Sequence, residues 1–292
     1  MFRRTLAALW RALTAPFRLA ARGVRRLRDA LAHEPEDTPV VDAFTRAFQQ
    51  PALLLEHLEA LRGHLLRSVA ALALTTAVSF AVATRVLDWL ARPIGGIAAL
   101  QAIEVTESVS AFMRVSLLSG FVLAFPYICL EVFLFISPGL RRAERLLALA
   151  VIPAAFALFV TGIAFAYYVM LPVALPFLLN FMGITTVPRP SNYVRFVTGL
   201  LFWIGVSFQF PLIIYALAAL GAVRARLLLD GWRIAVVLIA MMAAAITPTV
   251  DPVNMALVMA PMTVLYFLGI GLAALAERAR RRRLARATAE TA

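Results

Sequence analysis

The sequence predicts an all-α, polytopic membrane protein with six transmembrane helices. Hydrophobic residues make up 62% of the 292 residues and charged residues only 15%, whereas about a quarter of a soluble domain is charged. The apolar residues gather in six runs, most of them near the ~20 residues that a helix needs to cross a bilayer. Arginine supplies all 28 basic residues and gathers between the runs and at the chain ends. The net charge of +12 therefore indicates membrane surfaces rather than nucleic acid.

The expected spans follow one another along the chain as 66–87, 111–136, 146–170, 194–218, 233–248 and 254–275. The fifth is short, because the apolar residues Ile234 to Ile246 form only ~20 Å of helix against a hydrocarbon core of ~30 Å. Pro261 should interrupt the sixth span. We therefore expect this last pair to tilt toward one leaflet, to thin the bilayer locally or to be sheltered by other helices.

Three regions are predicted: an extension over 1–50, a membrane domain over 51–276 and a basic tail over 277–292. In the extension, apolar residues recur at three- or four-residue steps up to residue 31, and arginines recur every seven residues on another face. This pattern is typical of a helix that lies on an anionic membrane surface; a solvated tail with little order is the alternative. The Glu-Pro-Glu-Asp-Thr-Pro stretch over 34–39 indicates a linker.

Arginine is distributed unevenly between the two sides that six spans define. The segments on one side hold 23 of the 28 arginines and comprise 1–67, 137–145, 219–233 and 276–292. The loops on the other side hold Arg85, Arg92, Arg189 and Arg195. Because positively charged loops stay in the cytoplasm, both termini are predicted to be cytoplasmic. Arg114 lies near the outer start of the second span, where Glu104 and Glu107 are its candidate ion-pair partners.

Signatures of catalysis and of metal binding are missing from the sequence. Cys129 is the single cysteine, which excludes an intrachain disulfide. His33, His57 and His64 do not have the spacing of metal ligands, and there is no Walker loop, nucleophile elbow or glycine-rich phosphate loop. We therefore expect neither enzymatic activity nor a cofactor.

The segment between the second and third spans carries an informative polar pattern. Pro138-Gly139 ends a helix there, and Glu144 then lies among three arginines at the predicted cytoplasmic surface. A lone carboxylate in this position can receive a positively charged peptide. The alternative is an ion pair with the neighbouring arginines.

A second acidic group precedes the first span. On a helix, Glu59 shares one face with Glu56 and with Arg62. Carboxylates on such a face can bind guanidinium groups through two-pronged hydrogen bonds. The alternative is an ion pair between Glu59 and Arg62 on a solvated helix face.

The order of these features resembles the TatC family, the receptor subunit of the Sec-independent twin-arginine translocase. The resemblance covers residues 51–276 and depends on the order and spacing of several landmarks rather than on one motif. The early landmarks are His57-Leu58, Leu61-Arg62, Leu65, Pro93, Pro126, Phe135-Ile136-Ser137-Pro138-Gly139-Leu140 and Glu144-Arg145. The later landmarks are Phe165-Ala166-Tyr167, Phe208-Gln209-Phe210-Pro211, Thr247-Pro248, Asp251, Pro261-Met262 and Leu265-Tyr266.

The resemblance implies a cupped bundle of six helices in the cell membrane, with both termini cytoplasmic. It implies binding of twin-arginine signal peptides on folded cargo, and assembly with TatA- and TatB-type subunits and with further copies of the chain. Transport would use the proton-motive force without ATP. Carried over by position, Glu144 is the signal-binding carboxylate, Phe135 its aromatic neighbour and Arg62 part of the same site. The turn positions of the family correspond to Pro138, Gly139, Pro248 and Asp251.

The signal-binding motifs depart from the family pattern at two positions. Ala60 stands where the family has glutamate, and the adjacent Glu59 points ~100° away from that position on a helix. Glu131 lies in the second span, where glutamine is expected, about 8 Å inside the cytoplasmic boundary at 1.5 Å per residue. We hypothesise that Glu131 joins Glu144 in binding the signal arginines. The alternatives are a pair between Glu131 and an internal arginine, or a protonated carboxyl group.

Gln209 occupies a position where some members of the family have an intramembrane glutamate. With Phe210 and Pro211 it is a candidate docking point for the TatA or TatB helix. The alternative is a hydrogen bond between helices of this chain, worth ~0.6–2 kcal/mol.

Two other classes of function remain open at this point. A small-solute secondary transporter would favour repeated halves and ionisable residues at the bilayer midplane, whereas the acids here gather near the cytoplasmic edge and no convincing repeat is visible. A structural membrane subunit that has lost signal recognition is the second alternative, and Ala60 in place of glutamate keeps it open.

Overall fold

The computed structural model describes residues 51–137, 142–180, 186–247 and 252–290. The side chains of 51–56, 142–148, 150 and 282–290 are not part of this description. The predictions for the extension over 1–50 and for the turn residues Pro138, Gly139, Pro248 and Asp251 therefore lie outside the described residues. Regular structure within the described residues is helical throughout, which confirms the all-α fold.

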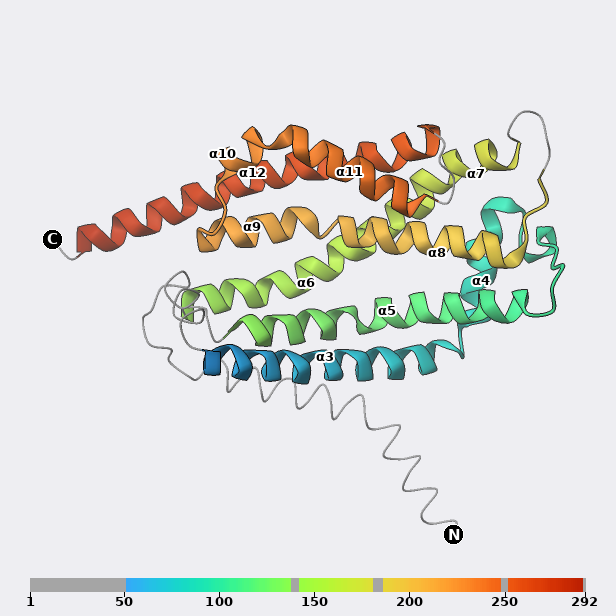
Figure 1. The fold of residues 1–292 in the computed structure, drawn as a ribbon, viewed down its shortest axis with the longest axis horizontal. Coiled ribbons are helices and arrows are strands. Elements are labelled where there is room, and N and C mark those ends of the chain that lie inside the picture. The colour runs from blue at the N-terminus through green and yellow to red at the C-terminus, as the bar shows by residue number, and fades with distance from the viewer. Residues whose placement is uncertain (1–50, 138–141, 181–185, 248–251, 291–292) are drawn as a thin grey trace, which may run out of the picture. The chain divides into compact units, whose positions relative to one another are not determined.

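The helices run in chain order as labelled in Figure 1. Two short 3₁₀ turns, Arg92–Ile94 and Ile97–Ala99, follow α4, and a π-helical turn, Ala166–Met170, joins α6 to α7. The α-helices are α3 (Pro51–Ser79), α4 (Ala83–Ala91), α5 (Glu107–Ile136), α6 (Arg142–Phe165), α7 (Leu171–Leu179), α8 (Pro190–Ser207), α9 (Phe210–Leu220), α10 (Ala225–Asp230), α11 (Trp232–Ile246) and α12 (Pro252–Glu290).

Four helical segments of the described chain are long and apolar enough to cross a bilayer. They are Glu107–Ile136, Val151–Leu179, Pro190–Leu220 and Pro252–Arg281, and they correspond to the second, third, fourth and sixth expected spans. A bent pair of helices supplies a fifth candidate at the position of the first span. The fifth expected span is the shorter apolar helix Trp232–Ile246, in agreement with its predicted shortness.

The first expected span, 66–87, is not one continuous helix. α3 ends at Ser79, and the segments His57–Ser79 and Ala83–Ile94 meet at 78°. At the bend the N–H groups of Ala81 and Val82 bond to carbonyls only three residues back. The Ser79 hydroxyl also donates to the Thr75 carbonyl, and back-bonding of this kind bends helices. Hydropathy alone does not register this bend, because both arms are apolar.

Prolines interrupt the helices less than the sequence suggests. The third span continues past residue 170 through the π-helical turn into α7. Pro172 follows this wider turn and lies in the first turn of α7. At that position the missing N–H of proline costs little helix stability. Pro261 lies inside the continuous α12, so the prediction that it interrupts the sixth span is wrong. Surrounding helices allow a proline to be accommodated inside membrane helices.

The described chain divides into two compact units. The first contains α3 up to Arg67 and the segment Tyr127–Ala150 of α5 and α6. The second contains the segment Ser68–Pro126 and the chain from Val151 onward.

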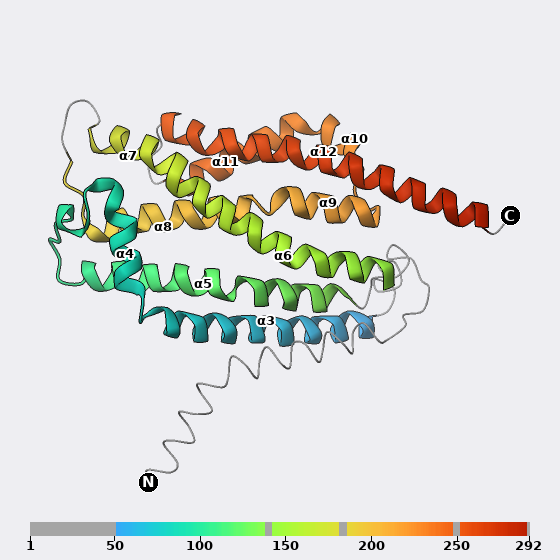
Figure 2. The same ribbon diagram turned by 180° about the vertical axis from the view of Figure 1, so that it is seen from behind.

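Small residues bring helices of the second unit close together. α9 and α12 run side by side (Figures 1 and 2). α5 approaches α3 at Gly120, where the Thr75 hydroxyl donates to the Gly120 carbonyl at 2.8 Å. α6 crosses α8 where Gly162 meets Gly205. Such close approaches are typical of membrane helices, whose association depends on packing more than on the hydrophobic effect.

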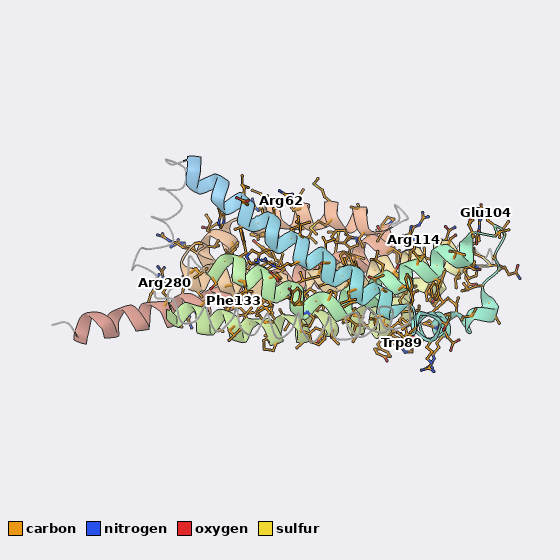
Figure 3. The ribbon with its side chains drawn as sticks, turned by 90° about the horizontal axis from the view of Figure 1, so that it is seen from below. Arg62, Trp89, Glu104, Arg114, Phe133 and Arg280 are labelled. Atoms are coloured by element: carbon orange, nitrogen blue, oxygen red, sulfur yellow. The ribbon has the colours of Figure 1, made fainter. Side chains whose placement is uncertain are left out.

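Polar groups of the segments before α5 and α8 find partners within the second unit. The N–H of Gln101 bonds to the Pro188 carbonyl, which brings the loop before α5 alongside the segment before α8. Arg189 therefore pairs with Glu104 at 2.9 Å and with the buried Glu107. The expected pairing of these acids with Arg114 is wrong, because Arg114 lies exposed further along α5, whereas Glu104 lies in the preceding loop (Figure 3).

Replacing Gly120 with alanine should lower the stability of the protein. The new Cβ would lie 2.6 Å from the Thr76 Cα, closer than side chains tolerate, and overpacking of this kind costs roughly 1–3 kcal/mol. Gly199→Ala is the matched control, because this helical glycine has no neighbour within 4 Å of the new Cβ. Thermal unfolding of the purified protein in detergent measures both variants. Equal unfolding midpoints for the two variants would contradict a close helix contact at Gly120.

Candidate functional site

The first unit brings polar and aromatic residues of α3 and α5 together. On α5, Tyr127, Glu131 and Phe135 follow one another at four-residue steps, so they share one helix face. On α3, His64 and Arg67 are three residues apart and also share a face. These two faces meet around the carboxylate of Glu131.

Glu131 is 2% exposed and its two oxygens receive hydrogen bonds from three side chains. Arg67 Nε donates to Oε1 at 3.1 Å and to Oε2 at 3.0 Å. The Tyr127 hydroxyl donates to Oε1 at 2.6 Å, and His64 Nδ1 lies 2.7 Å from Oε2. The carboxylate is therefore neutralised and hydrogen-bonded within the chain.

This arrangement is the internal pairing that stood as the alternative to a direct signal-binding role for Glu131. A buried carboxylate is costly unless it is paired and its oxygens are bonded, and Arg67 with Tyr127 and His64 meets both requirements. Removal of one partner from a buried pair commonly destabilises a protein by about 3–5 kcal/mol. The cluster thus fastens the end of α5 to α3 within the first unit.

Phe135 lies one helical turn beyond Glu131 and is held between two histidine rings. Its ring stacks on His57 with centroids 4.4 Å apart and an interplanar angle of 29°. The His64 ring meets it edge-on at 5.9 Å. His64 therefore touches both the carboxylate and the aromatic ring, and links the two residues that were predicted from sequence to belong to one site.

Glu59 and Arg62 lie exposed on α3, and Figure 3 labels Arg62 on this helix. Among the residues whose side chains are described, no ion pair within 4 Å involves either of them. The local pair between Glu59 and Arg62, which was the alternative for this face, is therefore not formed. Ala60 is exposed beside them.

Glu144 lies in the first turn of α6, and its side chain is outside the described residues. The structure thus brings Glu131 and Phe135 together with α3, and it adds His64, Arg67 and Tyr127, which sequence reasoning missed. The helical spacing of these residues is visible in the sequence. Their pairing across two helices is not, because it depends on how α3 and α5 pack.

Gln209 lies where the fourth expected span, 194–218, breaks into α8 and α9. The break precedes Pro211, whose lack of an N–H removes one helical hydrogen bond. Gln209 Nε2 donates to the Ala155 carbonyl of α6 at 3.1 Å, which is the helix–helix bond considered as the alternative to docking. Phe210 is 48% exposed, while Pro211 is buried.

No cluster of three or more histidine, cysteine or acidic side chains that could hold a metal ion occurs in the described part of the chain. The polar site of the first unit consists of a buried carboxylate with arginine, histidine and tyrosine partners beside an aromatic ring.

Comparison with known proteins places this architecture in one family. The family model "Sec-independent protein translocase protein (TatC)" matches residues 56–261. The chain is 33% identical to a TatC protein of Carboxydothermus hydrogenoformans, over 77% of this chain and 93% of the relative. It is also 33% identical to a TatC protein of Deinococcus radiodurans, over 81% of this chain and 90% of the relative.

A solved structure agrees with these sequence matches. The crystal structure of a twin-arginine translocase receptor, TatC, superposes with a TM-score of 0.68 at 29% identity, over 75% of this chain and 99% of that chain. The family consists of translocase components rather than enzymes. This protein therefore belongs to the TatC family of Sec-independent protein translocase proteins.

Proposed function

We propose that this protein is the receptor and core subunit of a twin-arginine translocase. It binds the twin-arginine signal peptides of folded cargo and holds TatA- and TatB-type subunits during export driven by the proton-motive force. The observation that carries this proposal is the match to a twin-arginine translocase receptor over 99% of that receptor's length. In the proposed topology both termini face the cytoplasm from the cell membrane, as the arginine distribution indicates.

In this proposal the exposed end of α3 and the start of α6 receive the signal arginines. Glu144 accepts one guanidinium through two-pronged hydrogen bonds, and Glu59 accepts the other. Support comes from the exposure of Glu59 and from the absence of an ion partner for it among the described side chains. Phe135 and Arg62 complete the surface that the peptide contacts.

Glu131 contributes to this site by positioning its neighbours. Direct contact with a signal arginine would require Arg67, His64 and Tyr127 to release the carboxylate. The four short contacts to its oxygens support a role in which Glu131 holds α3 against α5 and thereby fixes the His57–Phe135 stack.

Partner docking is proposed at Gln209, Phe210 and Pro211. The exposed ring of Phe210 at a helix break offers an apolar contact to a single-span subunit. The bond from Gln209 to the Ala155 carbonyl ties the α8–α9 break to α6. Gln209 would therefore support docking indirectly, by fixing the position of the break that exposes Phe210.

Export of a folded reporter tests the proposed function. The chain, supplied with its native partner subunits in a strain that lacks its own TatC, should export a folded reporter that carries a twin-arginine signal. A reporter whose two signal arginines are replaced by lysine is the control and should stay inside the cell. Correct membrane insertion without any export would favour the alternative, a structural subunit that has lost signal recognition, for which Ala60 is the motivating departure.

Glu144→Ala should weaken crosslinking of a twin-arginine peptide by at least about tenfold, because the paired hydrogen bonds to one guanidinium are lost, each worth ~1.5–3 kcal/mol. Glu131→Gln should weaken it less and should instead lower the thermal unfolding midpoint, since Arg67 then lacks its counter-charge. Both readings come from the same purified variants. If Glu131→Gln abolished peptide binding at an unchanged midpoint, the positioning role would be wrong and a direct role would replace it.

Phe210→Ala should reduce co-purification of the partner subunit while the unfolding midpoint stays close to wild type, because the side chain is exposed. Gln209→Leu should reduce both, since it also removes a bond between α6 and the α8–α9 break. Co-purification from detergent-solubilised membranes and thermal unfolding measure the two effects. Wild-type assembly of both variants would rule out docking at this position.

A further inference from the structure

A basic surface at one end of the second unit has no part in the proposed function. Two hydrogen bonds pin α10 to α12 there. The Glu277 carboxylate accepts from the N–H of Ala225 at 2.5 Å, at the start of α10. The Tyr266 hydroxyl donates to the Leu228 carbonyl at 2.6 Å. α10 and the C-terminal part of α12 therefore form one surface.

Five exposed arginines gather around the bond between Glu277 and Ala225. Arg224 and Arg226 flank Ala225, and Arg278, Arg280 and Arg281 follow Glu277 within four residues. None of the five forms an ion pair with another described residue. We call these five side chains the basic platform.

The α9–α10 turn lies against one member of this platform, Arg280. Gly221 ends α9 with φ +79°, and the Arg280 guanidinium lies where a Cβ at this glycine would be. Figure 3 shows Arg280 on the C-terminal part of α12. Glycine therefore permits both the left-handed turn and the close passage of the arginine.

Uncompensated charge on the basic platform creates a site for an anion. Like charges within a Debye length of about 10 Å repel one another. Glu277 caps α10 with its carboxylate, and Asp230 at the end of α10 is the other acid within residues 224–233 and 277–281. Bound anions would relieve this repulsion.

Exposed apolar side chains adjoin the basic platform. Leu227 is 68% exposed and Ile234 69% exposed, and Leu229 and Trp232 are exposed between them. The Arg233 guanidinium lies 5.8 Å from the centre of the Trp232 ring. Arginine and tryptophan next to exposed leucines are typical of segments that lie in the headgroup region of a bilayer.

We propose that α10, the first turn of α11 and residues 278–281 of α12 bind anionic phospholipid headgroups. The guanidinium groups receive the phosphate through paired hydrogen bonds, and Leu227, Trp232 and Ile234 enter the acyl boundary. The position suits this occupant, because α9 ends at Leu220 and the apolar residues of α12 give way to Glu277 and the following arginines. An acidic protein segment would match the charge but would leave the apolar side chains uncovered.

Lipid binding to the purified full-length protein tests this site. The probes are phosphatidylglycerol and phosphatidylcholine with the same acyl chains, titrated in neutral detergent and followed by native mass spectrometry. Phosphatidylglycerol should bind selectively. The triple variant Arg224→Gln/Arg226→Gln/Arg278→Gln should bind it on the order of a hundredfold more weakly, since each arginine near a lipid surface contributes about a fivefold gain.

The matched control is the triple variant Arg85→Gln/Arg92→Gln/Arg195→Gln, which removes three exposed arginines from the opposite loops and changes the net charge equally. Its lipid binding should stay at the wild-type level. Equal losses in both variants, or equal binding of the two lipids, would overturn the proposal. So would displacement of phosphatidylglycerol by inorganic phosphate at the same concentration, which would indicate an anion site without lipid preference. If the Arg224→Gln/Arg226→Gln/Arg278→Gln variant lost assembly with the TatA- and TatB-type subunits but bound lipid as wild type does, the basic platform would be assigned to an acidic protein segment instead.

Discussion

The structure depends on one constraint: polar groups inside a membrane domain must be satisfied within the chain. The last carbonyls of a helix lack the full set of bonds of its interior, and three tyrosine hydroxyls donate to carbonyls near the ends of α4 and α10 in the second unit. The bonds run from Tyr167 to Trp89, from Tyr193 to Leu90 and from Tyr266 to Leu228. The short helices α4 and α10 can therefore end beside apolar neighbours without unsatisfied backbone groups at these positions.

The same constraint explains why Glu131 can be buried. Its carboxylate is buried in the first unit, and each of its oxygens has two donors close by. Because the donors come from α3 as well as α5, satisfying the charge also sets the contact between these helices. One cluster thus satisfies the buried Glu131 carboxylate and also positions His64 against the Phe135 ring. A substitution that disturbs the carboxylate pairing should therefore also disturb the surroundings of Phe135.

Hydropathy predicted the four long spans and the shortness of α11, because the length and polarity of a run are local properties. It could not predict the bend after Ser79 or the continuity through Pro261, since these depend on bonds that the surrounding helices permit. The partners of charged residues show the same limit. In the sequence, Arg67 and Arg189 contributed only to the distribution of arginine between the two sides of the membrane, and neither was given an ion-pair partner. Both find their carboxylates 64 and 82 residues away, where chain spacing carries no information.

Charge balance then constrains how a divergent receptor of this kind can work. Two signal arginines bring two positive charges, and desolvated charges need counter-charges of equal number. Arg67 already neutralises Glu131 inside the chain, so that carboxylate adds nothing to a bound peptide unless its own pair is broken. Ala60 removes one expected carboxylate. In the proposed site, Glu59 on α3 and Glu144 on α6 are the acids assigned to balance the pair. The exposed position of Glu59, shifted around the helix from position 60, would require the peptide to approach α3 from a different side than in relatives with glutamate there.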